Sequence, residues 1–140
     1  MPLAEHPAIG SIITCDFTGL REPEMVKRRP VVVLSPKMRG REALCTIVPL
    51  STSAPSPVQP YHARIDIHPA LPERWESTGV WVKGDMLYTV SLRRLDFLRF
   101  GKDVNGKRVY YRKSLSNENL TIVRQCVLKA LGLGALTNHL

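Results

Sequence analysis

The sequence lacks any spacing of cysteine and histidine residues that is typical of a metal site. It has three cysteines and four histidines, and none of them form a Cys–Cys, Cys–His or His–His pair at the separations that zinc sites use. Cys15 and Cys45 lie inside apolar segments, so we expect buried thiols in a reducing compartment. No metal site is therefore expected.

The sequence also lacks the segments that direct a chain to or across a membrane. No run approaches the roughly 18 apolar residues of a spanning helix, and the N-terminus has no charged stretch followed by an apolar one. Neither a P-loop nor a GxGxxG motif is present, so no cofactor is expected. These absences favour a cytoplasmic protein without a membrane anchor.

Acidic residues are scarce compared with basic ones. The chain has 20 lysines and arginines against 12 aspartates and glutamates, a formal net charge of +8. The excess is concentrated between positions 83 and 113, where nine basic and three acidic residues give a net charge of +6. Such a block favours a polyanionic partner, either RNA, DNA or an acidic peptide. The alternative is a solvated surface that only keeps the protein soluble.

The length and apolar content are those of one folded domain. A chain of 140 residues with 44% hydrophobic residues can bury a core without disulfides or metals. No repeat and no boundary is visible, so a single domain over residues 1–140 is predicted.

Short apolar segments separated by turns predict a mainly β chain. The pair Asn105-Gly106, flanked by Val104 and Val109, indicates a hairpin. The mixed segment 86–100 is expected to hold a helical turn near Ser91 and a short strand. Further strands are predicted over residues 10–17, 30–35, 43–50, 61–67 and 79–85.

One helix is predicted near the C-terminus. Ser116 can cap it, Gly132 can end it, and apolar residues line one face up to Leu131. The last residues, 133–140, are expected to be frayed. Together the segments predict a mainly β (α+β) fold, a small barrel or strongly bent sheet packed by a C-terminal helix. Trp81 is expected to pack inside the barrel.

The most informative motif is the run RPVVVLSP at residues 29–36, followed by TIVPLST at residues 46–52. Each reads as a buried strand with polar residues at one end. If the two strands pair as an antiparallel hairpin, Arg29 meets Ser51 and Thr52. A guanidinium beside two hydroxyls can hold a phosphate and stabilise charge during phosphodiester cleavage. The alternatives are a strand-end surface arginine and ordinary turn chemistry at the two hydroxyls.

These two runs resemble the MazF/PemK toxins, small ribonucleases of bacterial toxin–antitoxin pairs. The resemblance covers about residues 10–98 and implies an SH3-like barrel, a homodimer with single-stranded RNA across its surface, and an antitoxin with an acidic disordered tail. In that family an arginine and a Thr/Ser pair carry catalysis, which maps to Arg29 and to Ser51-Thr52. The implied reaction is metal-independent attack of a 2′-OH that leaves a 2′,3′-cyclic phosphate and a 5′-OH.

The resemblance implies two further catalytic candidates. Lys83 and Asp85 stand two residues apart on a predicted strand, so they point to one face, where PemK-like members have Arg-x-Asp as an acid/base pair. Lysine keeps the charge but loses the planar fork of arginine, and an exposed ion pair is the alternative. Glu24 matches a carboxylate of the family's loop and could act as a base or be a solvated loop acid.

Basic residues around the two strands are the candidate RNA-binding residues. They are Lys27, Arg28, Lys37, Arg39 and His62, the last of which could instead be a surface histidine. Two other functions remain open. One is a catalytically inactive module of the same fold that binds RNA or an antitoxin. The other is a CcdB-like toxin that binds gyrase, although the Trp-Gly-Ile end of those toxins is missing here.

Overall fold

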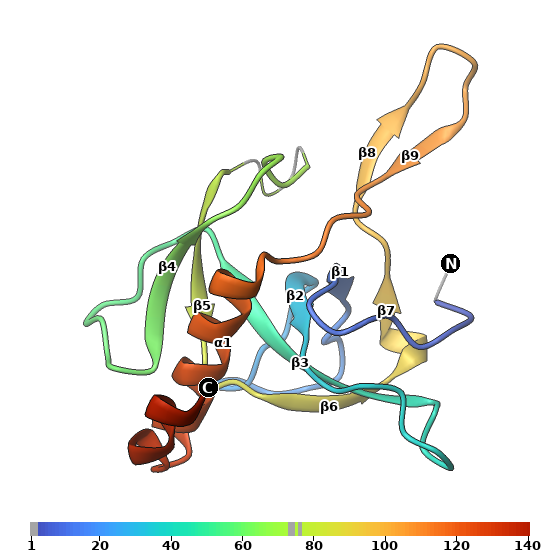
Figure 1. Cartoon of the computed structure of the whole chain (residues 1–140). Coiled ribbons are helices and arrows are strands. Elements are labelled where there is room, and N and C mark those ends of the chain that lie inside the picture. Colours follow the sequence, from blue (N-terminus) through green and yellow to red (C-terminus); the bar gives the residue numbers. More distant parts are fainter. Residues whose placement is uncertain (1–2, 73–74, 76) are drawn as a thin grey trace.

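The structure, a computed structural model, describes residues 3–72, 75 and 77–140. Seven strands form one antiparallel sheet in the order β4-β5-β3-β2-β1-β7, and β6 pairs with β3 beside this path (Figure 1). The strands are β1 (Ile12–Cys15), β2 (Arg29–Val33), β3 (Leu44–Ser51), β4 (His62–Asp66), β5 (Gly79–Lys83), β6 (Tyr88–Ser91) and β7 (Leu95–Asp96).

The long strand β3 joins the two halves of the sheet. Residues Leu44 to Ile47 pair with β6, Ile47 to Pro49 pair with β2, and Leu50 and Ser51 pair with β5. Among the described residues, β4 and β7 at the ends of the path pair with no further strand, so the sheet is strongly bent rather than closed. The predicted class, mainly β with a C-terminal helix, is confirmed.

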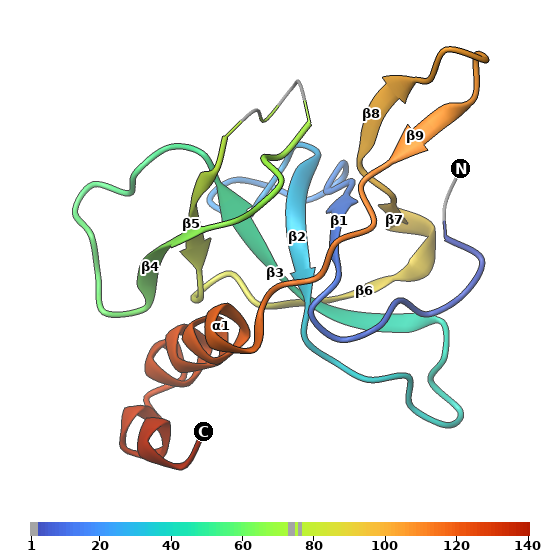
Figure 2. The ribbon, with the colours of Figure 1, turned by 45° about the horizontal axis from the view of Figure 1, so that its top comes forward.

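The helix α1 (Asn117–Ala130) lies against β4 and β5 (Figure 2). The hydroxyl of Ser116 accepts a hydrogen bond from the backbone N–H of Asn119, 3.1 Å away, which confirms the predicted cap. Gly132 follows the helix with φ +76°. The expectation of a frayed end was wrong, because Gly132 turns the chain back and a short 3₁₀ helix, Gly134–His139, packs on α1.

Alternating side chains divide the interior into two apolar clusters. The first lies under α1 and includes Val48, Leu50, Val80 and Val82. The second lies on the other face of β2 and β3 and is built from Ile13, Cys15, Phe17, Val31, Val33, Cys45, Ile47, Val90 and Leu95. Because successive residues of a strand point to opposite faces, these clusters also fix which residues point outward.

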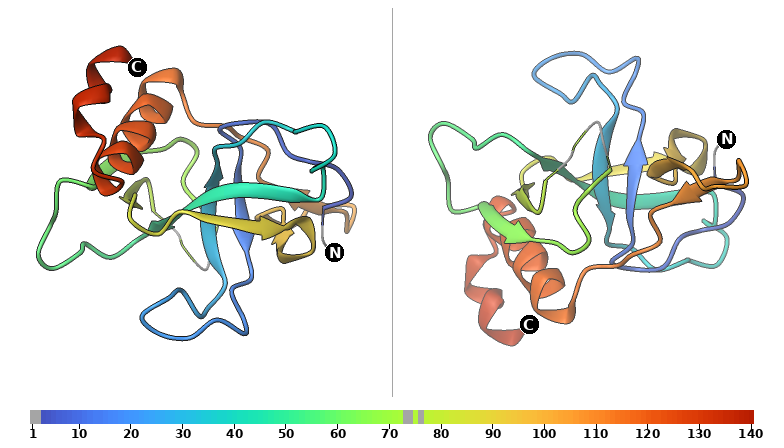
Figure 3. Two further views of the ribbon diagram at one scale, coloured as in Figure 1. Left: turned by 90° about the horizontal axis from the view of Figure 1, so that it is seen from below. Right: turned by 90° about the horizontal axis from the view of Figure 1, so that it is seen from above.

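A second, two-stranded sheet stands apart from the body. Strands β8 (Arg99–Lys102) and β9 (Arg108–Tyr110) form a hairpin that projects at the end of the molecule remote from α1 (Figures 1 and 3). Its turn contains Asn105-Gly106, as the sequence predicts. The 3₁₀ turn Leu92–Arg94 and β7 also appear where a helical turn and a short strand were expected. The predicted connection 69–78 lies partly outside the described residues.

Four of the five predicted strands are shorter than expected. The second covers Arg29–Val33 instead of residues 30–35, and the fourth covers His62–Asp66 instead of residues 61–67. The first covers Ile12–Cys15 instead of residues 10–17, and the fifth ends at Lys83 instead of Asp85. The fifth ends early because Gly84 and Asp85 form a turn in which the backbone N–H of Met86 bonds to the carbonyl of Lys83, 3.0 Å away.

Gly84 sets how closely this turn approaches the helix. A Cβ atom at this position would lie 2.7 Å from the backbone carbon and oxygen of Cys126 in α1. We expect Gly84→Ala to lower the free energy of unfolding by about 1–3 kcal/mol, since the helix must move to admit the methyl group. Urea denaturation measures this change.

Gly134→Ala is the matched control, because a Cβ there meets only the side chain of Lys129 at an ordinary 3.7 Å. Its effect should stay within about 0.5 kcal/mol. Equal stability of Gly84→Ala and the wild type would show that the turn does not rest on the helix.

Candidate functional site

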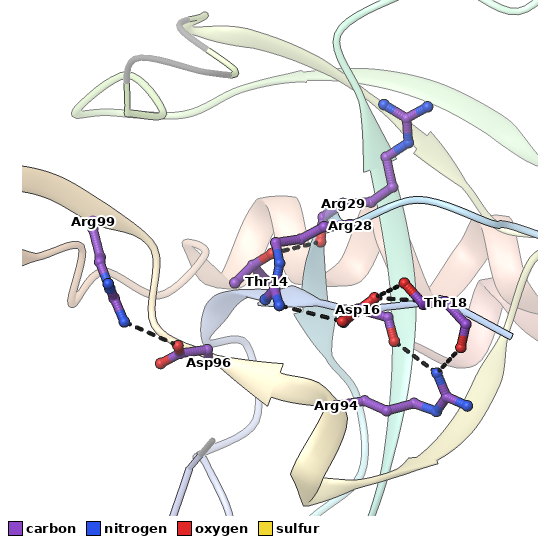
Figure 4. Close-up of polar contacts among 8 residues, drawn as sticks. All are labelled: Thr14, Asp16, Thr18, Arg28, Arg29, Arg94, Asp96 and Arg99. Carbon is purple, nitrogen blue, oxygen red and sulfur yellow. Dashed lines mark hydrogen bonds and ion pairs between the residues drawn. The ribbon is translucent and has the colours of Figure 1, made fainter. Parts of the chain in front are cut away.

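Arg29 begins β2 and Ser51 ends β3, so both lie at the same end of the antiparallel β2–β3 pair. Val31, two residues after Arg29, pairs with Pro49, two residues before Ser51. Figure 4 shows the Arg29 side chain extending over the sheet, away from that of Arg28. Within the described chain no carboxylate lies at ion-pair distance from Arg29, so its charge is available to a ligand.

Strands β4 and β5 extend this face. Ser51 pairs with Trp81, which pairs with Arg64, and Lys83 pairs with His62. Their neighbours Val80, Val82 and Ile65 turn inward to the cluster under α1, so these residues point the other way. The outer face therefore carries Arg29, Ser51, His62, Arg64, Asp66, Trp81 and Lys83. The carboxylate of Asp66 accepts a hydrogen bond from the guanidinium of Arg64 at 2.9 Å. The expectation for Trp81 was wrong, since it is only half-buried and belongs to neither cluster.

The hydroxyl of Ser51 takes part in a local turn. It donates to the carbonyl of Ser53 and accepts from the N–H of the same residue, both at 3.1 Å. Thr52 follows it and is exposed. The turn fixes the direction of the chain after β3, and Thr52 presents the more accessible of the two hydroxyls in this conformation.

Among the described residues, His62 rather than Lys83 has a side-chain nitrogen within 4 Å of the Asp85 carboxylate at the end of β5. Because β5 ends at Lys83, the predicted placement of both residues on one strand was wrong. The carboxylate of Asp85 lies 3.8 Å from Nε2 of His62, too far for a hydrogen bond. Nδ1 of His62 accepts the N–H of Gln59 at 3.0 Å, which assigns the proton of a neutral ring to Nε2.

His62 is not a surface residue, as its side chain is only 7% exposed. Burial lowers the pKa of the imidazole, Asp85 opposes this shift, and Lys83 reinforces it. The ring is therefore neutral near pH 7. His62 lies opposite Lys83 in the ladder and brings a polar group to the outer face.

Arg28 belongs to a separate polar cluster at the start of the β1–β2 loop. Its guanidinium lies 3.4 Å from the carboxylate of Asp16, and Arg94 donates to the carbonyls of Asp16 and Thr18 at 2.9 and 2.8 Å (Figure 4). Hydrogen bonds from Thr18, with help from Arg28 and Arg94, lower the pKa of Asp16. This cluster holds the base of the loop that leads to Arg29.

The other residues that the sequence suggests for catalysis or RNA binding lie in two different loops. Glu24 is exposed in the β1–β2 loop, where its carboxylate accepts the N–H of Arg21 at 3.1 Å, and Lys27 is exposed in the same loop (Figure 3). Lys37 and Arg39 lie in the connection after β2, at the far end of that strand from Arg29. Four residue steps of about 3.3 Å put roughly 13 Å between the two ends. Within one chain, these two residues do not join the outer face.

The cysteines are not part of the site. All three are buried and unpaired, as expected. Burial raises the pKa of Cys15 to about 12 and that of Cys45 to about 11, so both thiols stay protonated and unreactive near neutral pH. Among the described residues no three His, Cys, Asp or Glu side chains gather where they could hold a metal ion. No helix in the described chain is long and apolar enough to span a membrane.

The outer face combines three cationic side chains and a carboxylate with hydroxyls, an imidazole and an indole. Guanidinium and ammonium groups bind phosphate oxygens, and an aromatic ring offers a surface on which a base can stack. The sequence signal for Trp81 and Arg64 was present in the two-residue alternation of their strands. The alternation alone does not identify Trp81 and Arg64 as site residues. They reach Ser51 through the strand order β4-β5-β3, and the alternation does not reveal that order.

The fold and this face define a class: small, mainly antiparallel β proteins with a cationic face suited to a phosphate-bearing ligand. The model of the "PemK-like, MazF-like toxin of type II toxin-antitoxin system" family matches residues 8–131. The chain therefore belongs to the PemK/MazF toxin family.

Individual relatives agree with this assignment. An uncharacterised protein of Haemophilus influenzae is 29% identical and covers 97% of this chain and 98% of its own length. The crystal structure of MazF from Deinococcus radiodurans has a TM-score of 0.63 at 22% identity, over 90% of this chain and 96% of that one. A MazE–MazF structure from the same organism has a TM-score of 0.54 at 22% identity, over 91% and 97%. The solved structures share the fold.

The lowered pKa of His62 makes stability depend on pH. As the pH falls below the ordinary imidazole pKa of 6.5, His62 of the unfolded chain binds a proton. His62 of the folded chain binds this proton only at a lower pH, because its pKa is lowered. Stability is therefore lost as pH falls through this window. His62→Asn keeps an acceptor for the N–H of Gln59 but cannot titrate, so the fall in melting temperature between about pH 7.5 and 5.5 should be smaller than in the wild type.

Calorimetry at both pH values measures the fall in melting temperature for the wild type and for His62→Asn. Equal falls in the wild type and in His62→Asn would mean that the imidazole titrates as it does in the unfolded chain.

Proposed function

We propose that this toxin-family protein is an endoribonuclease that cuts single-stranded RNA without a metal ion. The observation that carries the proposal is that Arg29, with no carboxylate partner in the described chain, begins β2 at the end of the β2–β3 pair where Ser51 ends β3 and Thr52 follows. A guanidinium in this position can stabilise the charge that grows on a phosphate during attack by the neighbouring 2′-oxygen. Membership of the PemK/MazF family supports the same reaction.

The proposed step forms one bond and breaks one. The 2′-oxygen bonds to phosphorus as its proton leaves, the bond from phosphorus to the 5′-oxygen breaks, and that oxygen gains a proton. The products are a 2′,3′-cyclic phosphate and a 5′-OH. Arg29, Thr52 and Lys83 would hold the phosphate oxygens, and Ser51 would do so after leaving its turn.

Proton transfer is assigned to the carboxylates and the imidazole near these cations. Asp85 is exposed at the end of β5 and can accept the 2′-OH proton, with the dipole of the neutral His62 ring 3.8 Å away. Glu24, in the loop before Arg29, is the alternative base. Lys27 would bind the RNA backbone, and Arg28 would do so after leaving its contact with Asp16.

Family membership points to a protein antitoxin as a partner in addition to RNA. A type II system pairs a toxin with a protein antitoxin, and the Deinococcus structure contains both MazE and MazF. We infer that an antitoxin with an acidic disordered segment covers the outer face and competes with RNA, because both are polyanions. The unpaired, buried thiols fit a cytoplasmic site of action.

A second candidate is a module that binds RNA or antitoxin without cutting. The turn that occupies the Ser51 hydroxyl and the presence of Lys83 in place of an arginine favour it. The two candidates differ in a single measurable property, namely whether pure protein breaks RNA.

The test is incubation of the purified protein with a long single-stranded RNA in excess EDTA. We expect discrete fragments whose new 5′ ends accept phosphate from a kinase without prior phosphatase treatment. Arg29→Ala should lower the cleavage rate by about 10²–10³-fold, the usual loss for one such donor, while the fold persists. Arg124→Ala, on the exposed side of α1, removes the same charge and should cut at the wild-type rate.

If the RNA stays intact in the presence of folded wild-type protein, the ribonuclease function is excluded and the non-cutting binding module remains. Cleavage that EDTA abolishes would exclude the metal-independent mechanism, and full activity in Arg29→Ala would remove Arg29 from the reaction.

We also propose a homodimer. The open sheet ends and the exposed Leu131, Leu133 and Leu136 near the C-terminus leave edges and apolar surface that a second copy can cover. Light scattering at micromolar concentration should give about 31 kDa, twice the 15.7 kDa of one chain. A mass of one chain would contradict the dimer and limit the RNA surface to a single protomer.

A further inference from the structure

The β8–β9 hairpin contributes almost nothing to the cores described above. Residues 99–109 are all exposed, and the hairpin strands pair only with each other. Two buried residues hold its base, since the N–H of Tyr111 bonds to the carbonyl of Leu98 at 2.8 Å and the Tyr111 hydroxyl donates to the carbonyl of Pro69 at 2.7 Å. An isolated two-stranded hairpin is marginally stable, so these anchors keep an otherwise solvated arm in place.

The tip of the arm is also ordered by its own hydrogen bonds. One carboxylate oxygen of Asp103 accepts the N–H groups of Asn105 and Lys107 at 2.8 and 2.9 Å, and the N–H of Asp103 bonds to the carbonyl of Lys107 at 2.7 Å. Gly106 supplies the positive φ of +80° that the turn needs. A preorganised arm loses less conformational entropy when it binds a ligand.

The charge of the arm is largely uncompensated. Residues 99–113 contain six basic side chains and one acidic one, a net charge of +5. Arg99 lies 3.4 Å from Asp96, but in the described part of the chain no carboxylate comes within ion-pair distance of the other five. These five are Lys102, Lys107, Arg108, Arg112 and Lys113.

Aromatic rings lie among these cations. The guanidinium of Arg112 is 4.7 Å from the ring centre of Phe97 and 5.7 Å from that of Tyr110, and Phe100 is 43% exposed. Alternating arginine planes and aromatic rings bind the bases of single strands as well as their phosphates. An acidic peptide would use the charges but not the rings, so the composition favours RNA.

A pocket is lined both by residues at the base of the arm and by residues next to the start of β2. It has a volume of about 460 Å³ and is lined by residues that include Arg28, Thr14, Phe97 and Arg99. Arg28 directly precedes Arg29 in the chain, and Arg99 is the first residue of β8. Figure 2 shows the hairpin rising from the end of the molecule where β2 begins. A strand of RNA bound at Arg29 can therefore continue past Arg28 and along the arm.

We propose that the β8–β9 hairpin is an RNA-binding arm that holds the single strand outside the cleavage site and lengthens the stretch of substrate that the protein engages. The inference rests on the proposed ribonuclease function for its substrate. Its test uses binding alone and is independent of cutting.

The experiment compares two double variants that each remove two positive charges from exposed positions. Lys107→Gln/Arg108→Gln changes the arm, and Arg124→Gln/Lys129→Gln changes the exposed side of α1. The probe is a fluorescein-labelled RNA of about 20 nucleotides, long enough for an extended single-strand site, with 2′-O-methyl riboses that cannot attack their phosphates. Fluorescence anisotropy gives Kd at several salt concentrations.

We expect the arm variant to bind about tenfold more weakly at moderate salt and to lose about 1.4 from the slope of log K against log salt, or about 0.7 for each lost phosphate contact. The α1 variant should match the wild type. With cleavable RNA, the arm variant should raise KM on a long substrate at unchanged kcat, because it removes binding that ground and transition states share.

Other outcomes overturn the inference. Equal binding of the arm variant and wild type, or equal loss in both double variants, would show that the arm makes no specific contact. Loss of binding to an acidic peptide with RNA binding intact would assign the arm to a protein partner. A wild type that binds the probe but never cuts RNA refutes the catalytic function alone, and the two binding curves still decide the arm.

Discussion

The pairing of β3 with three different strands is the constraint on which the rest of the structure depends. Along one edge β3 pairs with β2, and along the other it pairs first with β6 and then with β5. The change of partner falls at Val48 and Pro49, and proline has no N–H that a ladder must satisfy. This switch bends the sheet and brings β5, distant in sequence, next to the end of β2. Without it, Lys83 and Trp81 would not share a face with Arg29.

Packing of α1 against β5 stabilises that bend. Valines of β5 and α1 fill one cluster, and Gly84 lets the end of β5 approach the backbone of Cys126. Burial on the helix side forces alternate residues of β4 and β5 to the opposite side. The polar outer face is thus a consequence of the apolar inner one, because a strand that packs every second residue must expose the others.

The cations of this protein fall into two groups with different physical roles. Arg28, Arg94 and Arg99 are bound to a carboxylate or to backbone carbonyls, and these contacts fix the β1–β2 loop and the base of the hairpin. Within the described residues, Arg29, Lys83 and five cations of the hairpin and its base have no carboxylate at ion-pair distance. A charge without an internal partner keeps its full attraction for a phosphate, whereas a paired one must first give up its contact.

The sequence by itself determined the local structure of this protein. Periodicity and turn residues predicted the first five strands, the hairpin at Asn105-Gly106 and the capped helix, because these patterns depend on neighbours along the chain. They also predicted that residues 30–35 pair antiparallel with the next strand, which puts Arg29 and Ser51 at one end of the pair. A direct meeting of these two side chains stays a prediction. Tertiary structure alone decided the rest. It brought Trp81 and Arg64 to Ser51 and buried His62 beside Asp85, because strand order and the bend in β3 arise from contacts between residues far apart in sequence.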